Sequence, residues 1–500
     1  MNDAIAFPID DPGPHSLAEL EARLARDLDF LALSPPAKDW LEPRAHPEWG
    51  PVLDIAIVGA GMAGLSAGFA LKCLGVRNMR VFDRSPEGFE GPWATFARME
   101  TLRSPPELAG PAIGFANLTF RAWFEAQFGR VAWTKVHRIP RLQWLDYLRW
   151  YRKVTDLPIE NRTELVDLTG DSETVLLTLR SAAGVERMAA RRLLLANGRD
   201  GLGGAYVPQL FAGLDRRCCA HTSDDIDFAA LRGKVVGVIG SGASAVDAAA
   251  EALEAGATRA AMLVRRADVP RINRGKGIWS PGMWHGFNRL TLAQRWSFVQ
   301  GIDDAAVPPP RDSMLRCSRH NNFSIITRCA PRNVALRDGR VVLDTTRGTL
   351  AFDFLILATG FTVDWPRRPE LAALAPHVLK WRDRFAPADR EFAQADHPFL
   401  GPDLEFLERT LGTAPWVERV HCFNFPANLS HGPITGDVPA ISVGAERVAK
   451  GVAAALWAED YARNWRRFLA WDDPELRGDE FTIDEDVTKF FAEEKSGAEA

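Results

Sequence analysis

Residues 53–64 read Leu-Asp-Ile-Ala-Ile-Val-Gly-Ala-Gly-Met-Ala-Gly, an apolar strand followed by a glycine-rich turn and the beginning of an apolar helix. Gly59, Gly61 and Gly64 fit the G-x-G-x-x-G pattern of dinucleotide-binding folds. The first glycine of this pattern makes a tight turn, the second lets the backbone approach a pyrophosphate, and the third lets the helix touch the strand. The stretch therefore predicts a Rossmann-like strand–turn–helix unit.

An acidic residue ends the next strand, as this reading requires. Asp83 lies 24 residues after Gly59, where a carboxylate accepts hydrogen bonds from a ribose hydroxyl. The helix N-terminus attracts phosphate charge, so Met62 and Ala63 are predicted cofactor contacts, together with Arg84 beside the acid. The first unit is thus expected to bind the adenosine half of FAD.

A second strand–turn–helix unit begins at Val235, about 180 residues further on. Its turn follows the related G-x-G-x-x-A pattern, and the predicted cofactor contacts are Gly240, Ser241, Gly242, Ala243 and Ser244. The next strand ends in Arg265 and Arg266 with no carboxylate, and arginines at this place favour a 2′-phosphate. The second unit is therefore expected to bind NADPH, with Arg274 and Lys276 as further candidate charges.

Two apolar strands bracket the second unit and indicate how the domains are arranged. Residues 193–198 and 354–360 each end in Ala-(Asn/Thr)-Gly, and we interpret them as crossovers between two domains. The predicted fold is α/β, with two Rossmann-like domains and the NADPH domain inserted into a discontinuous FAD domain. The expected limits are 51–210 and 340–460 for the FAD domain, 211–339 for the NADPH domain, 1–50 for an N-terminal helical extension and 461–500 for an acidic tail.

Composition restricts the partners. The 500 residues carry a formal net charge of −5, and no basic stripe suggests nucleic-acid binding. No apolar run reaches the length of a membrane span, and residues 1–14 do not resemble a secretory signal. Six scattered cysteines are typical of reduced thiols, so we expect a cytoplasmic protein. The expected partners are a small-molecule substrate and O2, and a homodimer is the expected assembly.

Taken together, these motifs resemble the class B flavin-dependent monooxygenases, from about residue 52 to 450. Phe211-Ala212-Gly213-Leu214 followed by His221-Thr222 is similar to the linker signature of that family, and residues 358–361 are similar to its A-T-G-(Y/F) element. The resemblance implies that Thr359 and Gly360 contact a cofactor. It further implies that NADPH reduces FAD, and that the flavin reacts with O2 to form the oxidising C4a-(hydro)peroxide.

The sequence departs from that family at two positions. Asp225 occupies the place where Baeyer–Villiger enzymes require an aromatic residue or proline, which lowers the odds of that activity. Asn197 stands at the first crossover, where the family usually has threonine.

The resemblance also indicates which segments lie near the flavin ring. Gly91-Pro92-Trp93 occupies the place of the family's G-G-x-W segment, so Trp93 is a candidate to stack near the flavin. Arg98 and Arg103 follow, and they would bind either a small anionic substrate or phosphates, or make ordinary salt bridges. The loop Ser430–Asp437 is expected to pass the flavin, with Asp437 as a cofactor contact. No acid–base constellation stands out.

The reaction remains open between several alternatives at this point. N-hydroxylation and hydroxylation of a heterocycle such as urate are the favoured oxygen insertions, and sulfur oxidation is a third. A flavoprotein oxidase or dehydrogenase without oxygen insertion is the alternative. A pyridine-nucleotide disulfide reductase shares both folds but needs a redox dithiol near the flavin. The stretch directly after the first glycine motif contains only Cys73, and Cys218 and Cys219 are adjacent rather than spaced as a redox pair.

Overall fold

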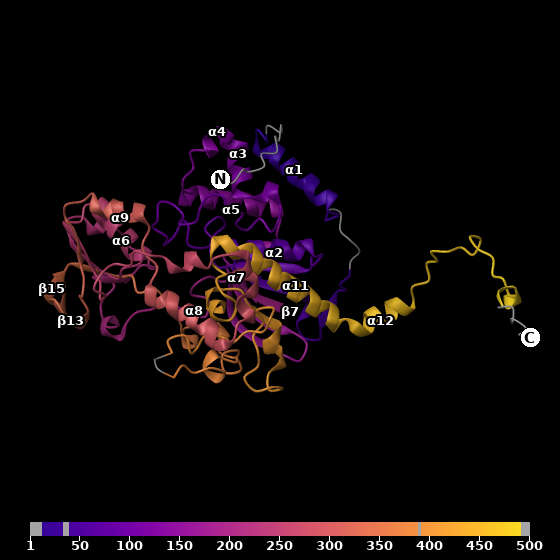
Figure 1. Ribbon diagram of the computed structural model, residues 1–500. Helices are drawn as coiled ribbons and strands as arrows, with labels where there is room; N and C mark the ends of the chain where they lie inside the picture. The colour runs from indigo at the N-terminus through magenta and orange to yellow at the C-terminus, as the bar shows by residue number, and fades with distance from the viewer. Residues whose placement is uncertain (1–12, 34–39, 389–391, 492–500) are drawn as a thin grey trace, which may run out of the picture. The chain divides into compact units, whose positions relative to one another are not determined.

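The computed structural model describes residues 13–33, 40–388 and 392–491 (Figure 1). The remaining parts of the expected extension at 1–50 and of the acidic tail at 461–500 lie outside these ranges. Two compact units are present, Met1–Leu456 and Trp457–Ala500, and each is described by itself.

The first sheet has eight strands and contains the first glycine motif. Its order is β4-β3-β2-β7-β6-β5, with β1 added on β2 and β18 on β7. Strands β2, β3, β4, β7 and β18 run parallel along their pairings, whereas β5, β6 and β7 form an antiparallel meander. The strands are β1 (Arg44–His46), β2 (Gly50–Val58), β3 (Met79–Asp83), β4 (Ile159–Asn161), β5 (Glu164–Gly170), β6 (Val175–Ser181), β7 (Gly184–Leu195) and β18 (Val420–Cys422).

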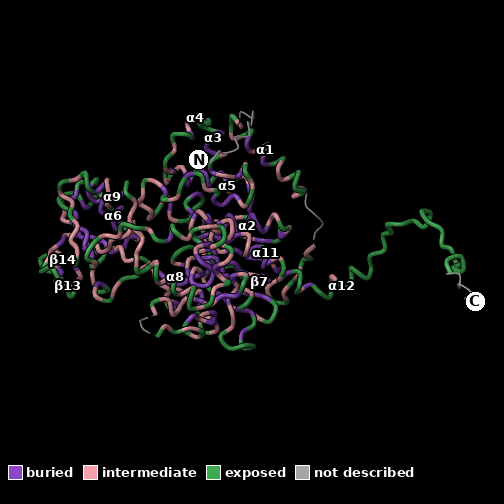
Figure 2. The backbone as a smooth tube through the Cα atoms, in the orientation of Figure 1, coloured by how far each residue is buried: buried purple, intermediate pink, exposed green. Residues whose placement is uncertain are grey.

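Burial explains why the centre of this sheet is so apolar. Ile55, Ala56 and Ile57 of β2 are completely buried, as expected for a parallel strand covered on both faces. The buried residues form the purple centre of Figure 2. The helices that come before, between or after the strands of this sheet in the chain include α2 (Met62–Cys73), α3 (Phe120–Phe128), α4 (Arg130–Trp133), α5 (Arg141–Thr155), α10 (Asn428–His431) and α11 (Ile441–Glu459).

The second sheet contains the second glycine motif and is entirely parallel. Its order is β12-β11-β10-β16-β9, and α6 and α9 pack together beside it. These elements are β9 (Cys219–His221), β10 (Val235–Ile239), β11 (Arg259–Leu263), β12 (Phe323–Ile326), β16 (Phe354–Leu357), α6 (Ala243–Glu254) and α9 (Arg311–Ser318). Helices α7 (Pro281–Gly286) and α8 (Leu292–Ala305) lie between β11 and α9 in the chain. The parallel strands that carry the two glycine motifs confirm the expected α/β fold with one Rossmann-like domain inserted into the other.

A short antiparallel pair links the two passages of the chain between the sheets. Strand β8 (Gly203–Ala205) pairs with β17 (Phe361–Val363) immediately after each predicted crossover. Strands β13 (Pro331–Arg337), β14 (Arg340–Thr345) and β15 (Gly348–Phe352) form a separate sheet whose Val341, Leu343 and Phe352 pack in one cluster with Leu355 and Leu357. The boundary expected at 340 stays a prediction, and these contacts favour a boundary after Leu357.

The N-terminal amphipathic pattern forms α1 (Leu17–Phe30), whose start is capped by Ser16. Leu20 and Leu24 are buried and belong to the core of the first sheet's domain. The predicted helix is therefore a packing helix, because its apolar stripe is covered by the domain that follows it.

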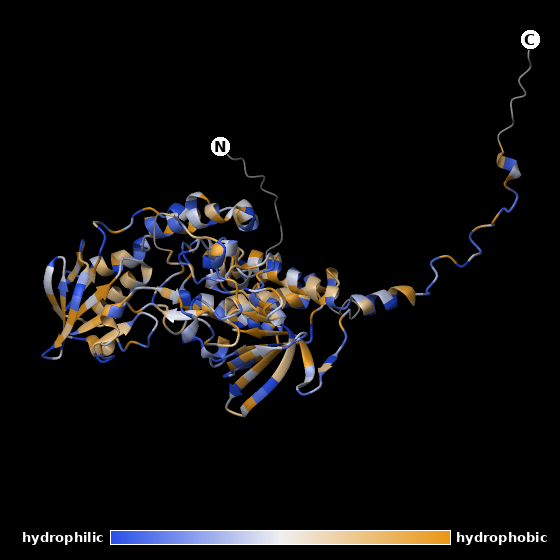
Figure 3. Cartoon of the chain, turned by 90° about the horizontal axis from the view of Figure 1, so that it is seen from below, coloured by the Kyte–Doolittle hydropathy of each residue, from blue (hydrophilic) through white to orange (hydrophobic). Residues whose placement is uncertain are grey.

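The second unit contains α12 (Tyr461–Leu469), and among the described residues no helix is long and apolar enough to cross a membrane. Figure 3 shows hydrophobic residues gathered in the strands of the sheets and hydrophilic residues in many connecting loops.

Candidate active site

The first glycine turn joins β2 to α2 at the carboxyl edge of the sheet. Gly59 has φ +106°, and a Cβ added there would lie 2.5 Å from the Ala196 carbonyl oxygen at the end of β7. A Cβ on Gly64 would lie 1.8 Å from the Gly59 carbonyl oxygen. Both positions need glycine because backbone approaches them too closely for any side chain.

Gly61 differs, because the space beside it is open. It is the N-cap of α2, no side chain of the described residues caps this end, and an added Cβ would meet only Gly91, at 3.8 Å. The first N–H groups of a helix have no partner within the helix and carry partial positive charge. The turn at Met62 and Ala63 therefore fits the pyrophosphate of a dinucleotide.

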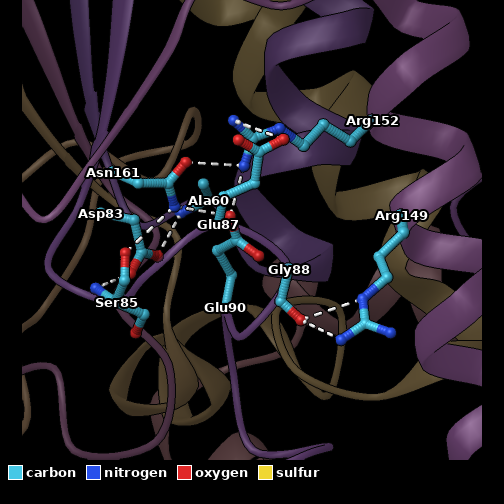
Figure 4. A network of polar contacts seen from close by, with 9 residues as sticks. All are labelled: Ala60, Asp83, Ser85, Glu87, Gly88, Glu90, Arg149, Arg152 and Asn161. Carbon is cyan, nitrogen blue, oxygen red and sulfur yellow. Dashed lines mark hydrogen bonds and ion pairs between the residues drawn. The ribbon is translucent and has the colours of Figure 1, made fainter.

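Asp83 ends β3 beside this turn and is nearly buried. One carboxylate oxygen accepts the Ala60 N–H at 2.8 Å, and the other accepts the Ser85 N–H at 2.8 Å (Figure 4). The carboxylate is thus fixed to the glycine turn, and each oxygen keeps a further acceptor site for a ribose hydroxyl. Arg84 is more exposed and lies 3.5 Å from Asp200.

The loop after Asp83 is anchored by polar contacts that the sequence motifs did not indicate. Glu90 is buried and pairs with Arg152, and Asn161 donates to Glu90 at 2.6 Å. Arg149 donates twice to the Gly88 carbonyl, at 2.8 and 3.1 Å (Figure 4). Arg149 and Arg152 are three residues apart on α5, and this spacing was the only signal in the sequence. The network holds Gly91 beside Gly61.

Trp93 follows this loop and is packed in the core. Its ring meets Trp144 edge-on with centroids 6.2 Å apart, and its carbonyl accepts a hydrogen bond from Arg141. The ring of Trp93 thus has a packing role in the core. Its position near the flavin remains a prediction.

The two candidate substrate arginines have different surroundings. Arg98 donates to the carbonyls of Phe96, Thr222 and Asp224 and lies 5.1 Å from the centre of the Phe228 ring. Arg98 therefore joins the loop after Asp83 to the linker segment at Thr222 and Asp224. Three of its five N–H groups are used in these bonds.

Arg103 makes fewer contacts and remains exposed. The Arg103 side chain donates to the Pro308 carbonyl at 3.2 Å, and the Arg138 side chain donates to the backbone carbonyl of Arg103. The surrounding protein lowers the pKa of Arg103 by keeping water from it; the charges of Asp437 and Asp247 oppose this shift, and those of Arg199 and Arg138 add to it. The side chain of Arg103 is thus open to solvent, while nearby protein atoms partly desolvate its guanidinium group. Such a position suits a group that binds a ligand.

The second glycine turn repeats the first. Gly240 has φ +139°, and a Cβ there would lie 2.7 Å from the Ala358 carbonyl oxygen. Gly242 is the N-cap of α6, where no side chain of the described residues caps the helix and an added Cβ would meet nothing within 4 Å. The predicted contacts Ser241, Ala243 and Ser244 lie at this uncapped end, so the segment also fits a pyrophosphate.

The arginines after β11 are not equivalent. Arg266 donates to the carbonyls of Asp303 and Asp304 at 3.1 and 2.6 Å, at the end of α8. The side chain of Arg265 is exposed and makes no hydrogen bond or ion pair with the described residues, and the same is true of the side chains of Arg274 and Lys276. Arg265 is therefore the better placed of the two for a 2′-phosphate.

The second crossover contacts the linker between the sheets. Thr359 donates to the Tyr206 carbonyl, and the Tyr206 N–H donates to Gly360 at 2.8 Å. His221 packs edge-on against Phe361 with centroids 5.8 Å apart, and burial lowers its pKa. These contacts give Thr359 and Gly360 a structural role at the crossover, while their contact with a cofactor stays a prediction.

The C-terminal loop reaches the carboxyl edge of the first sheet. Asp437 lies 3.6 Å from Arg199, which follows the first crossover. His431 is buried, accepts from Arg447 at Nδ1 and donates from Nε2 to the Gly401 carbonyl at 2.8 Å. Burial lowers the pKa of His431 to about 4, so this residue is a neutral structural group.

The cysteines do not form a dithiol near the first glycine turn. All six are free, and Cys73 is the last residue of α2. A helix of that length rises about 1.5 Å per residue, so Cys73 lies far from the N-terminal end where a dinucleotide would bind.

The chain is similar to known flavoproteins. A sequence profile of the pyridine nucleotide-disulphide oxidoreductase family matches residues 56–279, which include both glycine turns. The chain is 40% identical over 466 residues to the FAD-dependent urate hydroxylase of Xanthomonas campestris pv. campestris, covering 93% of this chain and 98% of that protein.

Solved structures share the fold at much lower identity. The reduced form of ornithine hydroxylase from Pseudomonas aeruginosa has a TM-score of 0.62 at 16% identity, covering 81% of this chain and 100% of that chain. The ornithine N-hydroxylase of Kutzneria sp. 744, solved with reduced FAD, NADP+ and L-ornithine, has a TM-score of 0.61 at 15% identity, covering 81% and 100%.

Proposed function

The chain belongs to the class B flavin-dependent monooxygenases, and from this premise we propose that it binds FAD and NADPH and hydroxylates a small anionic heterocycle, with urate as the substrate. The observation that carries the choice of substrate is the identity of 40%, over nearly the whole of both chains, with a urate hydroxylase. In the reaction one oxygen atom of O2 enters the substrate. The other leaves as water, for which the hydride of NADPH supplies two electrons and one proton, and the solvent supplies the second proton. Bound flavin would supply the redox chemistry.

We assign FAD to the first site and NADPH to the second. The uncapped end of α2 and the fixed carboxylate of Asp83 support a pyrophosphate and a ribose with a free hydroxyl. The uncapped end of α6, followed by Arg265 without a nearby carboxylate on β11, supports a phosphorylated ribose. The candidate contacts Arg84, Trp93, Thr359, Gly360 and Asp437 complete the assignment around the carboxyl edges of the two sheets.

Oxygen consumption with urate tests the proposed activity directly. Purified FAD-loaded protein should oxidise NADPH and consume O2 in a one-to-one ratio when urate is present, with little hydrogen peroxide released. NADPH oxidation that yields one hydrogen peroxide per NADPH, with or without urate, would instead identify an oxidase without oxygen insertion.

Amine N-hydroxylation is the second candidate, because two of the structurally similar enzymes act on ornithine. The arginines at the site disfavour a cationic amine, since like charges repel in a partly desolvated place. L-Ornithine and L-lysine in the same assay, measured against urate, distinguish the two reactions.

We also propose a homodimer and a cytoplasmic location as finer expectations. Helix α12 exposes Tyr461, Trp465 and Phe468 along one face, and such apolar faces are typically covered by a partner. Six free cysteines support a reducing compartment, which cell fractionation can check.

A further inference from the structure

Arg199 stands directly after the first crossover, at the carboxyl edge of the first sheet. It follows β7, whose neighbours β2 and β18 lead into Gly59 and into Asn424. Ligands of α/β sheets bind beyond the carboxyl ends of parallel strands. Arg199 was not among the residues that the sequence motifs indicated, and nothing in the FAD or NADPH assignment uses it.

The segment that carries Arg199 is held by buried contacts. Gly198 has φ +83°, and its carbonyl accepts the Phe425 N–H at 3.4 Å. Asn197, at the position where the family usually has threonine, accepts from the buried Asn424 side chain at 2.9 Å. Thr435 in turn donates to the Asn424 carbonyl at 2.7 Å. The backbone at Arg199 is therefore fixed by β18 and by the C-terminal loop.

The guanidinium itself remains accessible. Its carbon lies 4.8 Å from the centre of the Phe425 ring, and its nearest carboxylate is Asp437 at 3.6 Å. The side chain of Arg199 is 51% exposed and that of Asp437 is 45% exposed, so this ion pair is long and only partly shielded. A planar cation stacked on a ring keeps its N–H edge free for a planar anion.

Charge around this position favours an anion. Arg103 lies near enough to Arg199 and Arg138 to be repelled by both, and Asp437 and Asp247 are the carboxylates that oppose them. Burial raises the pKa of Asp247. The groups that interact electrostatically here are therefore three guanidinium groups, those of Arg103, Arg199 and Arg138, against two carboxyl groups.

We propose that Arg199, seated on Phe425 and supported by Arg103, is the specificity residue that binds the anionic edge of the heterocyclic substrate. This inference rests on the proposed function and adds the residue that selects a planar monoanion over a neutral or cationic molecule. Urate carries one negative charge at neutral pH, and its flat ring places a carbonyl oxygen beside a deprotonated ring nitrogen, two acceptors that match the two parallel donors of the guanidinium fork. Asp437 is the internal partner that the substrate displaces.

Urate binding to oxidised FAD-loaded protein tests the proposal without turnover. Arg199→Met should raise the urate Kd about ten- to a hundredfold, the loss expected for a charge-assisted hydrogen bond. Arg199→Lys keeps the charge but loses the fork, and it should give a smaller rise. Flavin content and the rate of flavin reduction by NADPH should equal those of the parent. Arg180→Met is the matched control, because Arg180 is an exposed arginine paired with Glu164 at 2.7 Å.

The possible results separate the inference from the function on which it rests. A urate Kd within twofold of the parent would overturn the role of Arg199 while leaving urate hydroxylation intact. Loss of flavin, or a raised KM for NADPH with unchanged urate affinity, would assign Arg199 to a cofactor phosphate and also overturn it. If the parent protein neither binds nor oxidises urate, both the proposed substrate and the inference fail.

Discussion

At Gly61 an added side chain would enter open space beside Gly91, whereas at Gly64 it would enter the Gly59 backbone. We expect Gly61→Val to fold with a melting temperature close to that of the parent apoprotein but to lose bound flavin, because the side chain occupies the approach of the pyrophosphate. Gly64→Ala should lower the melting temperature, because strand and helix must separate. Flavin-to-protein ratios and thermal unfolding measure both effects. Full flavin retention by Gly61→Val would place the flavin elsewhere.

Arg265 and Arg266 give a second prediction at the scale of the residue. Arg265→Gln should raise the KM for NADPH about ten- to a hundredfold and leave the KM for NADH nearly unchanged, since only a charge-assisted contact to the 2′-phosphate is lost. Arg266→Gln should affect coenzyme preference less, because Arg266 is held by carbonyls at the end of α8. Steady-state kinetics with both coenzymes check this. Equal effects on NADPH and NADH would direct attention to Arg274 and Lys276.

Substitutions of Arg98 and Arg103 should distinguish a role in substrate binding from a role in stability. Arg103→Ala should leave NADPH-driven flavin reduction intact but release more hydrogen peroxide, because a displaced acceptor loses the orientation that oxygen transfer requires. Arg98→Ala removes ties to Thr222 and Asp224 and should lower thermal stability as well. Peroxide yield per NADPH is the measurement. Unchanged coupling in Arg103→Ala would remove that residue from the substrate site.

At the scale of elements, the returning segment around β18 and α10 contains two buried histidines, His421 and His431, and a half-buried one, His397. Burial lowers the pKa of His397 and His431 to about 4 and that of His421 to about 3. An unfolded histidine has a pKa near 6.5, so below that pH the unfolded chain binds more protons than the folded chain. The free energy of unfolding should therefore fall as the pH falls from about 6.5 to 4, by up to about 1.4 kcal/mol per pH unit for each histidine.

Denaturant unfolding between pH 7 and 4.5 measures this dependence. In His431→Gln the slope should become shallower by the share of one titrating group, although the loss of its bonds to Gly401 and Arg447 lowers stability at every pH. His15, which is exposed at the N-terminus, offers the control substitution His15→Gln. An identical slope in His431→Gln and the parent would show that the acid sensitivity arises from other groups.

At the scale of the whole molecule, α12 supports a prediction about assembly. Trp465 and Phe468 stack with centroids 5.2 Å apart and are both exposed. If a second copy covers this face, Trp465→Glu should shift the protein from dimer to monomer in light scattering, because a buried carboxylate is costly. Arg467→Glu places the same carboxylate on the opposite side of the helix, with a charge change one unit larger, and should leave the dimer unchanged. A parent protein that is already monomeric would contradict the proposal.

Much of the architecture follows from local patterns. Two strand–glycine–helix units, the carboxylate of Asp83 and the arginines after β11 are visible in the sequence because each depends on residues close together in the chain. At Gly59 and Gly240 a strand turns into a helix beside the end of a neighbouring strand. The carbonyl of that neighbour leaves no room for a Cβ, so both positions require glycine. These features predicted an inserted α/β fold, and the parallel strands at the centre of both sheets confirm it.

Long-range contacts were beyond those patterns. Only tertiary structure shows that β13–β16 stay with the second sheet, that Trp93 packs on Trp144, and that Arg98 binds carbonyls more than 100 residues away. The same holds for Arg199, whose partners Phe425 and Asp437 come from the other end of the chain. The role of an arginine side chain depends on the groups around it. Those groups come together only because parallel strands bring distant loops to one edge of a sheet.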